Sequence, residues 1–158
     1  MSDSKYNKFV HLRNYTQYSL SRGALRIEDL VKFCIKEKMP ATAISDYYNL
    51  FGSLEFSLIC EESGIQPIIG ANLLVKDKKF ESGNVLLLSK NEKGYENLVK
   101  LVSMSYLDNS ENQEPHITFN NLVNFNDGLV CMAGGNYGIL TKNFSNDIRL
   151  SGLLVDFF

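Results

Sequence analysis

The sequence contains no tryptophan and only two histidines, His11 and His116, among its 158 residues. A histidine-rich metal site therefore cannot be built from this chain, because zinc sites require three or four protein ligands. The three cysteines, Cys34, Cys60 and Cys131, are widely separated and form no C-x-x-C pair. This spacing excludes the common cysteine metal and redox motifs, and it predicts a reduced protein with free thiols.

An excess of basic residues and long apolar runs are also lacking. The chain has 16 lysines and arginines against 18 acidic residues, which gives a net charge of −2. Proteins that bind nucleic acid tightly carry a basic surface, so we expect no direct tight DNA binding. No apolar stretch approaches the roughly 18 residues that a membrane helix needs. The N-terminal segment also lacks the layout of a signal peptide, so we expect a cytoplasmic location and no membrane partner.

What is present is an ordinary hydrophobic content of 44% in a chain long enough for one domain, which we expect to span residues 1–158. Apolar patterning predicts strands at 8–15, 41–45, 65–76, 84–89 and 128–133. It predicts helices at 26–39, 50–63, 92–106 and 118–125, and a helical apolar tail from Ile139 onward. Strands that alternate with helices indicate an α/β fold with a largely parallel sheet.

Local signals mark the ends of two of these helices. Asn49 and Gly64 are the predicted N-terminal and C-terminal caps of the helix over 50–63, and Asn91 is the predicted N-cap of the next. The 3–4 spacing of apolar residues predicts the face by which this next helix packs on the core: Tyr95, Leu98, Val99, Val102 and Tyr106.

Asp46 follows the apolar strand "ATAIS" directly and is the first candidate for chemistry. A carboxylate at the end of a strand can serve as a metal ligand or a general base. It can equally accept backbone N–H groups in the turn before Asn49, and the residues alone favour this structural role.

The stretch "AGGNYG" at 133–138 follows a predicted strand and could cradle a phosphate. The dinucleotide motif G-x-G-x-x-G would need glycine at Ala133, however, so a tight strand-to-helix turn is favoured. His11, in an apolar segment, could be a lone ligand, but we favour a hydrogen-bonded histidine of the core. Cys131 has no nearby histidine to activate it as a nucleophile.

Several ordered blocks of sequence resemble one family. These blocks are similar to the N-terminal PHP domain of the alpha subunit of bacterial DNA polymerase III. They are "FVHLRNYTQYSLSRGALRIEDLV", "MPATAISDYYNLFGSLEF", "GIQPIIGANLLV", "LLLSKNEKGYENLVKLVSMSYL" and "PHITFNNL" followed by "GLVCMAGG". The resemblance runs from about residue 9 to residue 138 and leaves 139–158 unassigned. It implies a distorted (β/α) barrel of the PHP type, incomplete at its C-terminus.

The resemblance also implies a metal pocket whose ligands have been replaced. The family's metal-pocket positions fall here on His11, Arg13, Tyr15, Arg22, Asp46, Tyr47, Asn72 and Asn84. Only His11 and Asp46 keep a ligating residue type, and two ligands cannot hold a metal cluster. We therefore expect no metal, no cofactor and no catalytic residue, and a salt bridge from Asp46 to Arg13 or Arg22.

These expectations favour a non-catalytic domain or fragment of the replicative polymerase, without the palm domain that carries the polymerase carboxylates. Its implied partners are the rest of the alpha subunit and the proofreading exonuclease subunit. An active PHP phosphoesterase or proofreading nuclease is the first alternative. A small nucleotide-binding α/β protein that uses "AGGNYG" is the second.

Overall fold

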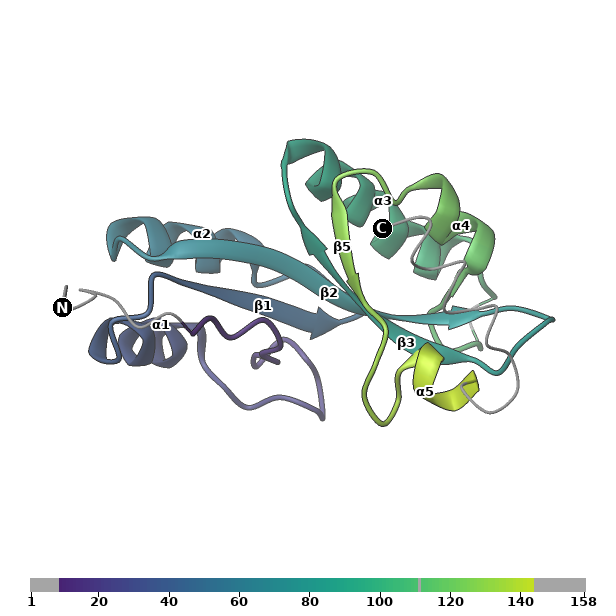
Figure 1. The fold of residues 1–158 in the computed structure, drawn as a ribbon, viewed down its shortest axis with the longest axis horizontal. Helices are drawn as coiled ribbons and strands as arrows, with labels where there is room; N and C mark the ends of the chain where they lie inside the picture. Colours follow the sequence, from purple (N-terminus) through teal and green to yellow (C-terminus); the bar gives the residue numbers. More distant parts are fainter. Residues whose placement is uncertain (1–8, 111, 144–158) are drawn as a thin grey trace, which may run out of the picture.

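The structure is a computed structural model that describes residues 9–110 and 112–143, arranged as a mixed sheet with helices at both ends (Figure 1). In chain order the elements are α1 (Ile27–Lys36), β1 (Ala41–Tyr47), α2 (Ser53–Glu62), β2 (Gln66–Lys76), β3 (Gly83–Ser89), α3 (Glu92–Leu107), β4 (Ile117–Thr118), α4 (Phe119–Asn124), β5 (Leu129–Met132) and α5 (Ile139–Asn143). The α/β class is confirmed. The part of the predicted tail helix beyond residue 143 lies outside the described residues.

The sheet has the strand order β1-β2-β3-β5, with β4 added beside the end of β2. β1 and β4 run parallel to β2, whereas β3 is antiparallel to both β2 and β5. The prediction of a largely parallel sheet is therefore wrong. Residues 77–82 are too few for the crossover that a parallel neighbour of β2 would need, so β2 and β3 form a hairpin. Within the described residues the sheet stays open, in agreement with a barrel that is not closed.

The long strand β2 connects two regions of packing (Figure 1). Around its first half, α1 and α2 cover β1 with a cluster that includes Ile27, Phe56 and Cys60, each with no exposed surface. Around its second half, α3 and α4 cover β3 and β5 through a cluster that includes Leu98 and Leu101. Burying these side chains stabilises the fold by about 2 kcal/mol each.

The predicted strand over 8–15 is wrong for residues 9–15, which have no regular secondary structure. This segment still lies along the open edge of β1, where Ala43 N donates to His11 O at 2.9 Å and Ser45 N donates to Asn14 O at 2.9 Å. The Asn14 side chain replaces a ladder bond, because its Nδ2 donates to Ala43 O at 2.8 Å. An irregular segment covers this edge and blocks further strand pairing.

The buried face of α3 agrees with the predicted one at Leu98 and differs from it at Tyr95 and Tyr106. Leu98 and Leu101 have no exposed surface, whereas Tyr95 is 41% and Tyr106 50% exposed. Asn97 also belongs to the buried face, where its Nδ2 donates to Asp127 O at 2.8 Å. A polar side chain can be buried where it finds a hydrogen-bond partner.

Helix caps were predicted with mixed success. The Asn91 cap is confirmed, since its Oδ1 accepts from Gly94 N at 2.9 Å. Gly64 has the positive φ of 68° expected after a helix end. The Asn49 cap is wrong: α2 begins at Ser53 after Gly52. Asn49 Oδ1 instead accepts from Phe51 N at 3.1 Å, which uses the acceptor in a turn before the helix.

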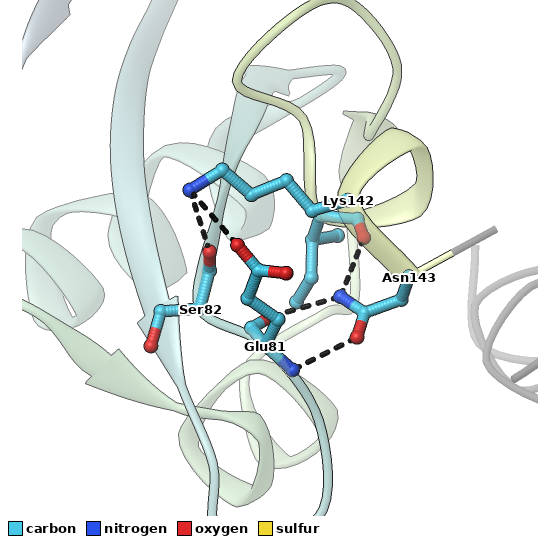
Figure 2. A network of polar contacts seen from close by, with 5 residues as sticks. Glu81, Ser82, Lys142 and Asn143 are labelled. Atoms are coloured by element: carbon cyan, nitrogen blue, oxygen red, sulfur yellow. Dashed lines mark hydrogen bonds and ion pairs between the residues drawn. The ribbon is translucent and has the colours of Figure 1, made fainter. Parts of the chain in front are cut away.

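The last described helix, α5, is held against the β2–β3 loop by two of its side chains (Figure 2). Asn143 accepts from Glu81 N and donates to Glu81 O, each at 2.8 Å. Lys142 Nζ donates to Ser82 O at 3.0 Å and lies 3.9 Å from the Glu81 carboxylate. These contacts fix the position of Lys142 near the start of β3. None of the described helices is both long and apolar enough to span a membrane.

Candidate functional site

Asp46 lies inside β1 with 2% of its surface exposed, and the segment before α1 satisfies its carboxylate. Thr16 donates to it twice, from N to Oδ1 at 2.6 Å and from Oγ1 to Oδ2 at 2.7 Å. Ser19 Oγ donates to Oδ1 at 2.5 Å and accepts from Tyr47 N at 3.1 Å. Asp46 therefore fastens a loop 30 residues earlier in the chain, rather than the turn that follows it.

The predicted salt bridge from Asp46 to an arginine is wrong within the described residues. Neither Arg13 nor Arg22 has a carboxylate partner in the described part of the chain. The hydroxyl and amide donors of Thr16 and Ser19 bind both oxygens of the buried Asp46 carboxylate in place of a guanidinium. The guanidinium carbon of Arg22 instead lies 4.2 Å from the centre of the Tyr47 ring, a cation–π contact.

The two arginines line adjoining clefts at the surface. The larger cleft has a volume of about 520 Å³, and its lining includes Arg22, Tyr48, Glu114 and Lys142. The smaller has a volume of about 270 Å³, and Arg13 lies on its wall. The walls of both clefts share Tyr15, Tyr47, Asn84 and Tyr137. Six of the eight predicted pocket positions line these clefts: Arg13, Tyr15, Arg22, Tyr47, Asn72 and Asn84.

His11 and Asp46 do not line either cleft. The His11 ring lies 4.8 Å from the Phe9 ring and 6.3 Å from the Phe33 ring, on the side of α1. The two positions that keep a ligating residue type are thus turned to structural contacts. His11 is half-buried and packs against the exposed rings of Phe9 and Phe33, so it lies at the surface rather than in the hydrophobic core.

Two tyrosines of the clefts have their hydroxyls engaged. Tyr15 accepts from Asn72 Nδ2 at 3.1 Å, and burial raises the pKa of its phenol above the ordinary value of 10. Tyr48 donates to Glu114 Oε1 at 2.8 Å. Burial, and to a smaller extent this hydrogen bond, raises the pKa of the Tyr48 phenol well above its ordinary value. Both phenols are therefore neutral at physiological pH, and a neutral phenol is a poor metal ligand.

The polar and aromatic lining residues Glu114, Tyr137 and Lys142 were not among the predicted pocket positions. They come from the α3–β4 loop, the Gly-rich turn and α5, which are far from the family's pocket positions in sequence. Only Tyr137 lay in a stretch that had been singled out. The predicted strand-to-helix turn is confirmed there, with Asn84 N donating to Tyr137 O at 2.7 Å and Gly135 at a φ of 93°.

The cysteines occupy the predicted kinds of element, with Cys34 and Cys60 in helices and Cys131 in a strand, and all three are free thiols. Burial raises the pKa of both Cys60 and Cys131 to about 12. A thiol with such a pKa is protonated at neutral pH, and the protonated form is a poor nucleophile.

The donors around the clefts do not fit the metal cluster that the fold family implies. Guanidinium groups, neutral phenols and amides replace carboxylate and imidazole ligands at six positions. Among residues 9–110 and 112–143, histidine, cysteine, aspartate and glutamate nowhere gather in a group of three or more that could hold a metal. Among the described residues of the site, Asp46 is the one buried acid, and its carboxylate oxygens accept hydrogen bonds from Thr16 and Ser19.

Comparison with known proteins places this chain in a family. The PHP domain model matches residues 11–152, so the chain belongs to the PHP domain family. It is 37% identical over 152 residues to DNA polymerase III subunit alpha of Caulobacter vibrioides, covering 92% of this chain and 13% of that protein. It is 39% identical over 135 residues to the same subunit of Rickettsia felis, covering 85% of this chain and 11% of that protein.

The chain thus spans about an eighth of the length of the relatives it matches. Among solved structures, a metal-dependent phosphoesterase of Bifidobacterium adolescentis aligns with 61% of this chain and 32% of its own, at a TM-score of 0.49 and 20% identity.

Proposed function

We propose that this chain is a non-catalytic PHP domain of a replicative DNA polymerase alpha subunit, acting in DNA replication in the cytoplasm. Its similarity to that subunit in several bacteria supports the assignment to replication. The observation that carries the non-catalytic role is the set of residues lining the clefts. Arg13, Arg22, Tyr15 and Tyr47 stand at the family's metal-pocket positions.

The proposed role is structural. The domain supports the body of the polymerase and offers a docking surface, for which the proofreading exonuclease subunit is the partner we propose. Exposed apolar side chains on the helices suit such contacts, since Leu54 is 72% and Leu58 51% exposed on the outer side of α2. We propose that residues 1–158 form one domain and that polymerase chemistry resides in segments of the relatives that this chain does not match.

The metal content of the purified chain tests this function. We expect less than about one-tenth equivalent of zinc or manganese after dialysis against either ion, because the site offers no sufficient set of ligands. We also expect no manganese-dependent release of phosphate from a phosphoester or of nucleotides from DNA. Stoichiometric zinc or manganese at the clefts, together with manganese-dependent hydrolysis, would establish the active phosphoesterase instead.

A further inference from the structure

We propose that the two adjoining clefts form a metal-free binding site for a nucleoside monophosphate, with the phosphate at Arg22 and the base against the tyrosines. This inference goes beyond the structural role proposed above and does not depend on the polymerase assignment. It requires only the positions and charges of the residues around the clefts.

The charge of the clefts is opposite to that of the chain. The chain carries a net charge of −2, whereas the cleft residues include Arg13, Arg22 and Lys142 against the single acid Glu114. Neither arginine is neutralised by a carboxylate in the described part of the chain. The lining thus has a formal charge of +2, three cations less one anion, which matches a phosphate monoester dianion. Guanidinium groups bind such oxyanions through paired N–H bonds.

Arg22 is oriented for this task before any ligand arrives. Its guanidinium lies with its carbon 4.2 Å from the Tyr47 ring centre, so one surface of the group is covered by the ring. The N–H groups at its edge have no described side-chain partner and remain available to an anion. Stacking of this kind reduces the entropy that the side chain would lose when it binds.

Lys142 supplies a second fixed cation on the wall of the larger cleft. Its ammonium group donates to Ser82 O at 3.0 Å and lies 3.9 Å from a Glu81 oxygen. An ammonium group has three donors, so one remains for a ligand. Glu114 is the opposing charge, and Tyr48 binds it at 2.8 Å. This acid on the lining disfavours anions of higher charge than a monophosphate.

Aromatic rings form the wall between the two cationic regions. The rings of Tyr15 and Tyr47 lie 4.8 Å apart and pack against each other, and Arg22 covers the Tyr47 ring. The ring open to a base is therefore Tyr137, which is 70% exposed and lines both clefts. Nucleobases stack on such rings whatever their sequence. The amide of Asn84 also lines both clefts and can donate to or accept from the edge of a base. The volumes of about 520 and 270 Å³ suit a small-molecule ligand.

Calorimetric titration of the 158-residue chain in excess EDTA tests the site with three probes: dAMP, inorganic phosphate and deoxyadenosine. We expect dAMP to bind at one site and at least about tenfold more tightly than either of its two parts, a difference of about 1.4 kcal/mol. Absence of dAMP binding at millimolar concentration, or binding that EDTA abolishes, would overturn the proposal. Equal affinities for dAMP and inorganic phosphate would overturn the assignment of a nucleotide.

A matched pair of variants locates the binding. Arg22→Gln should weaken dAMP at least about tenfold, because it removes the guanidinium that holds the phosphate. Arg26→Gln changes an exposed arginine outside the clefts and should leave the affinity unchanged. Equal affinities of the two variants would contradict the site. If Arg22→Gln fails to fold, NMR of the unaltered chain tests the site instead. The chemical-shift changes on adding dAMP should be largest at Tyr15, Tyr47 and Asn84. Changes that concentrate elsewhere would refute the proposal.

These results are separable from the test of the proposed function. Metal analysis measures whether the clefts hold zinc or manganese, whereas the titration measures nucleotide binding with metals removed. A chain that binds neither metal nor dAMP would keep the structural role and lose this inference. A chain that binds metal stoichiometrically and dAMP only with that metal would lose both.

Discussion

The carboxylate of Asp46 shows how one residue can keep a family's residue type while its contacts are structural. Thr16 and Ser19 donate three hydrogen bonds to it, in a site where 2% of its surface is exposed. The family resemblance placed Asp46 at a metal-pocket position, and the sequence gave no sign of these partners. Threonine and serine are common in loops, and only folding brings them to β1.

Replacing Asp46 by alanine should lower the free energy of unfolding by about 3 kcal/mol. The substitution leaves buried donors of Thr16 and Ser19 without an acceptor, and each unsatisfied buried group costs about 1–3 kcal/mol. Urea denaturation of both proteins measures the difference. Asp127→Ala, at an exposed carboxylate, is the matched control and should change stability by less than about 0.5 kcal/mol. A loss at Asp46 no greater than this control would contradict the anchoring role.

At the scale of the element, α3 shows a conflict between helix propensity and packing. Gly94 is buried in its first turn, where a glycine weakens a helix by about 1 kcal/mol relative to alanine. The structure explains the glycine, because an added Cβ would lie 1.8 Å from Gly128 O and 2.5 Å from the carbonyl carbon. The helix and the turn before β5 approach each other closely at this point.

Gly94→Ala should therefore destabilise the protein by about 2 kcal/mol or more, although propensity alone predicts a gain of about 1 kcal/mol. The clash is with backbone, which cannot rotate away as a side chain can. Thermal or urea unfolding measures the change. Ser103→Ala, at an exposed position of the same helix, should shift stability by less than about 0.5 kcal/mol. An increase in stability for Gly94→Ala would show that the two segments do not pack as described.

At the scale of the whole molecule, the groups of residues 9–110 and 112–143 that have shifted pKa values all shift upward. Burial is the largest cause for the thiols of Cys60 and Cys131, whose pKa values rise from 9.0 to about 12. Burial likewise raises the pKa of the Cys34 thiol and of the Tyr15 and Tyr48 phenols. Each of these groups is neutral when protonated, so the folded state holds its protons to higher pH than the unfolded state does.

The free energy of unfolding should consequently fall as pH rises from about 9 to about 12. In this interval the unfolded chain releases protons that the folded chain retains, and linkage then favours unfolding. Urea denaturation at several pH values measures the slope. Cys131→Ser removes one of the titrating groups, and its slope should be smaller over the same interval. A stability that stays constant or increases with alkaline pH would contradict the burial of these groups.

The order and class of most elements could be predicted from the sequence, because helix periodicity, apolar runs and capping residues are local signals. The Asn91 cap and the Gly64 helix end follow from short stretches of chain, and both are confirmed. The segment before α1 could not be predicted in this way. Its alternation resembles a strand, but the Asn14 side chain bonds to Ala43 O and the backbone stays irregular.

The PHP resemblance and the chemical types at the pocket positions follow from residue identity and order alone. Which of those residues come into contact depends on how the chain folds. Folding joined Arg13 and Arg22 to Tyr137 and Lys142 around two clefts, and it withdrew His11 and Asp46 into other contacts. Hydrogen bonding and packing depend on distances in space between segments that are up to about 130 residues apart in the sequence. A local sequence pattern does not contain these distances.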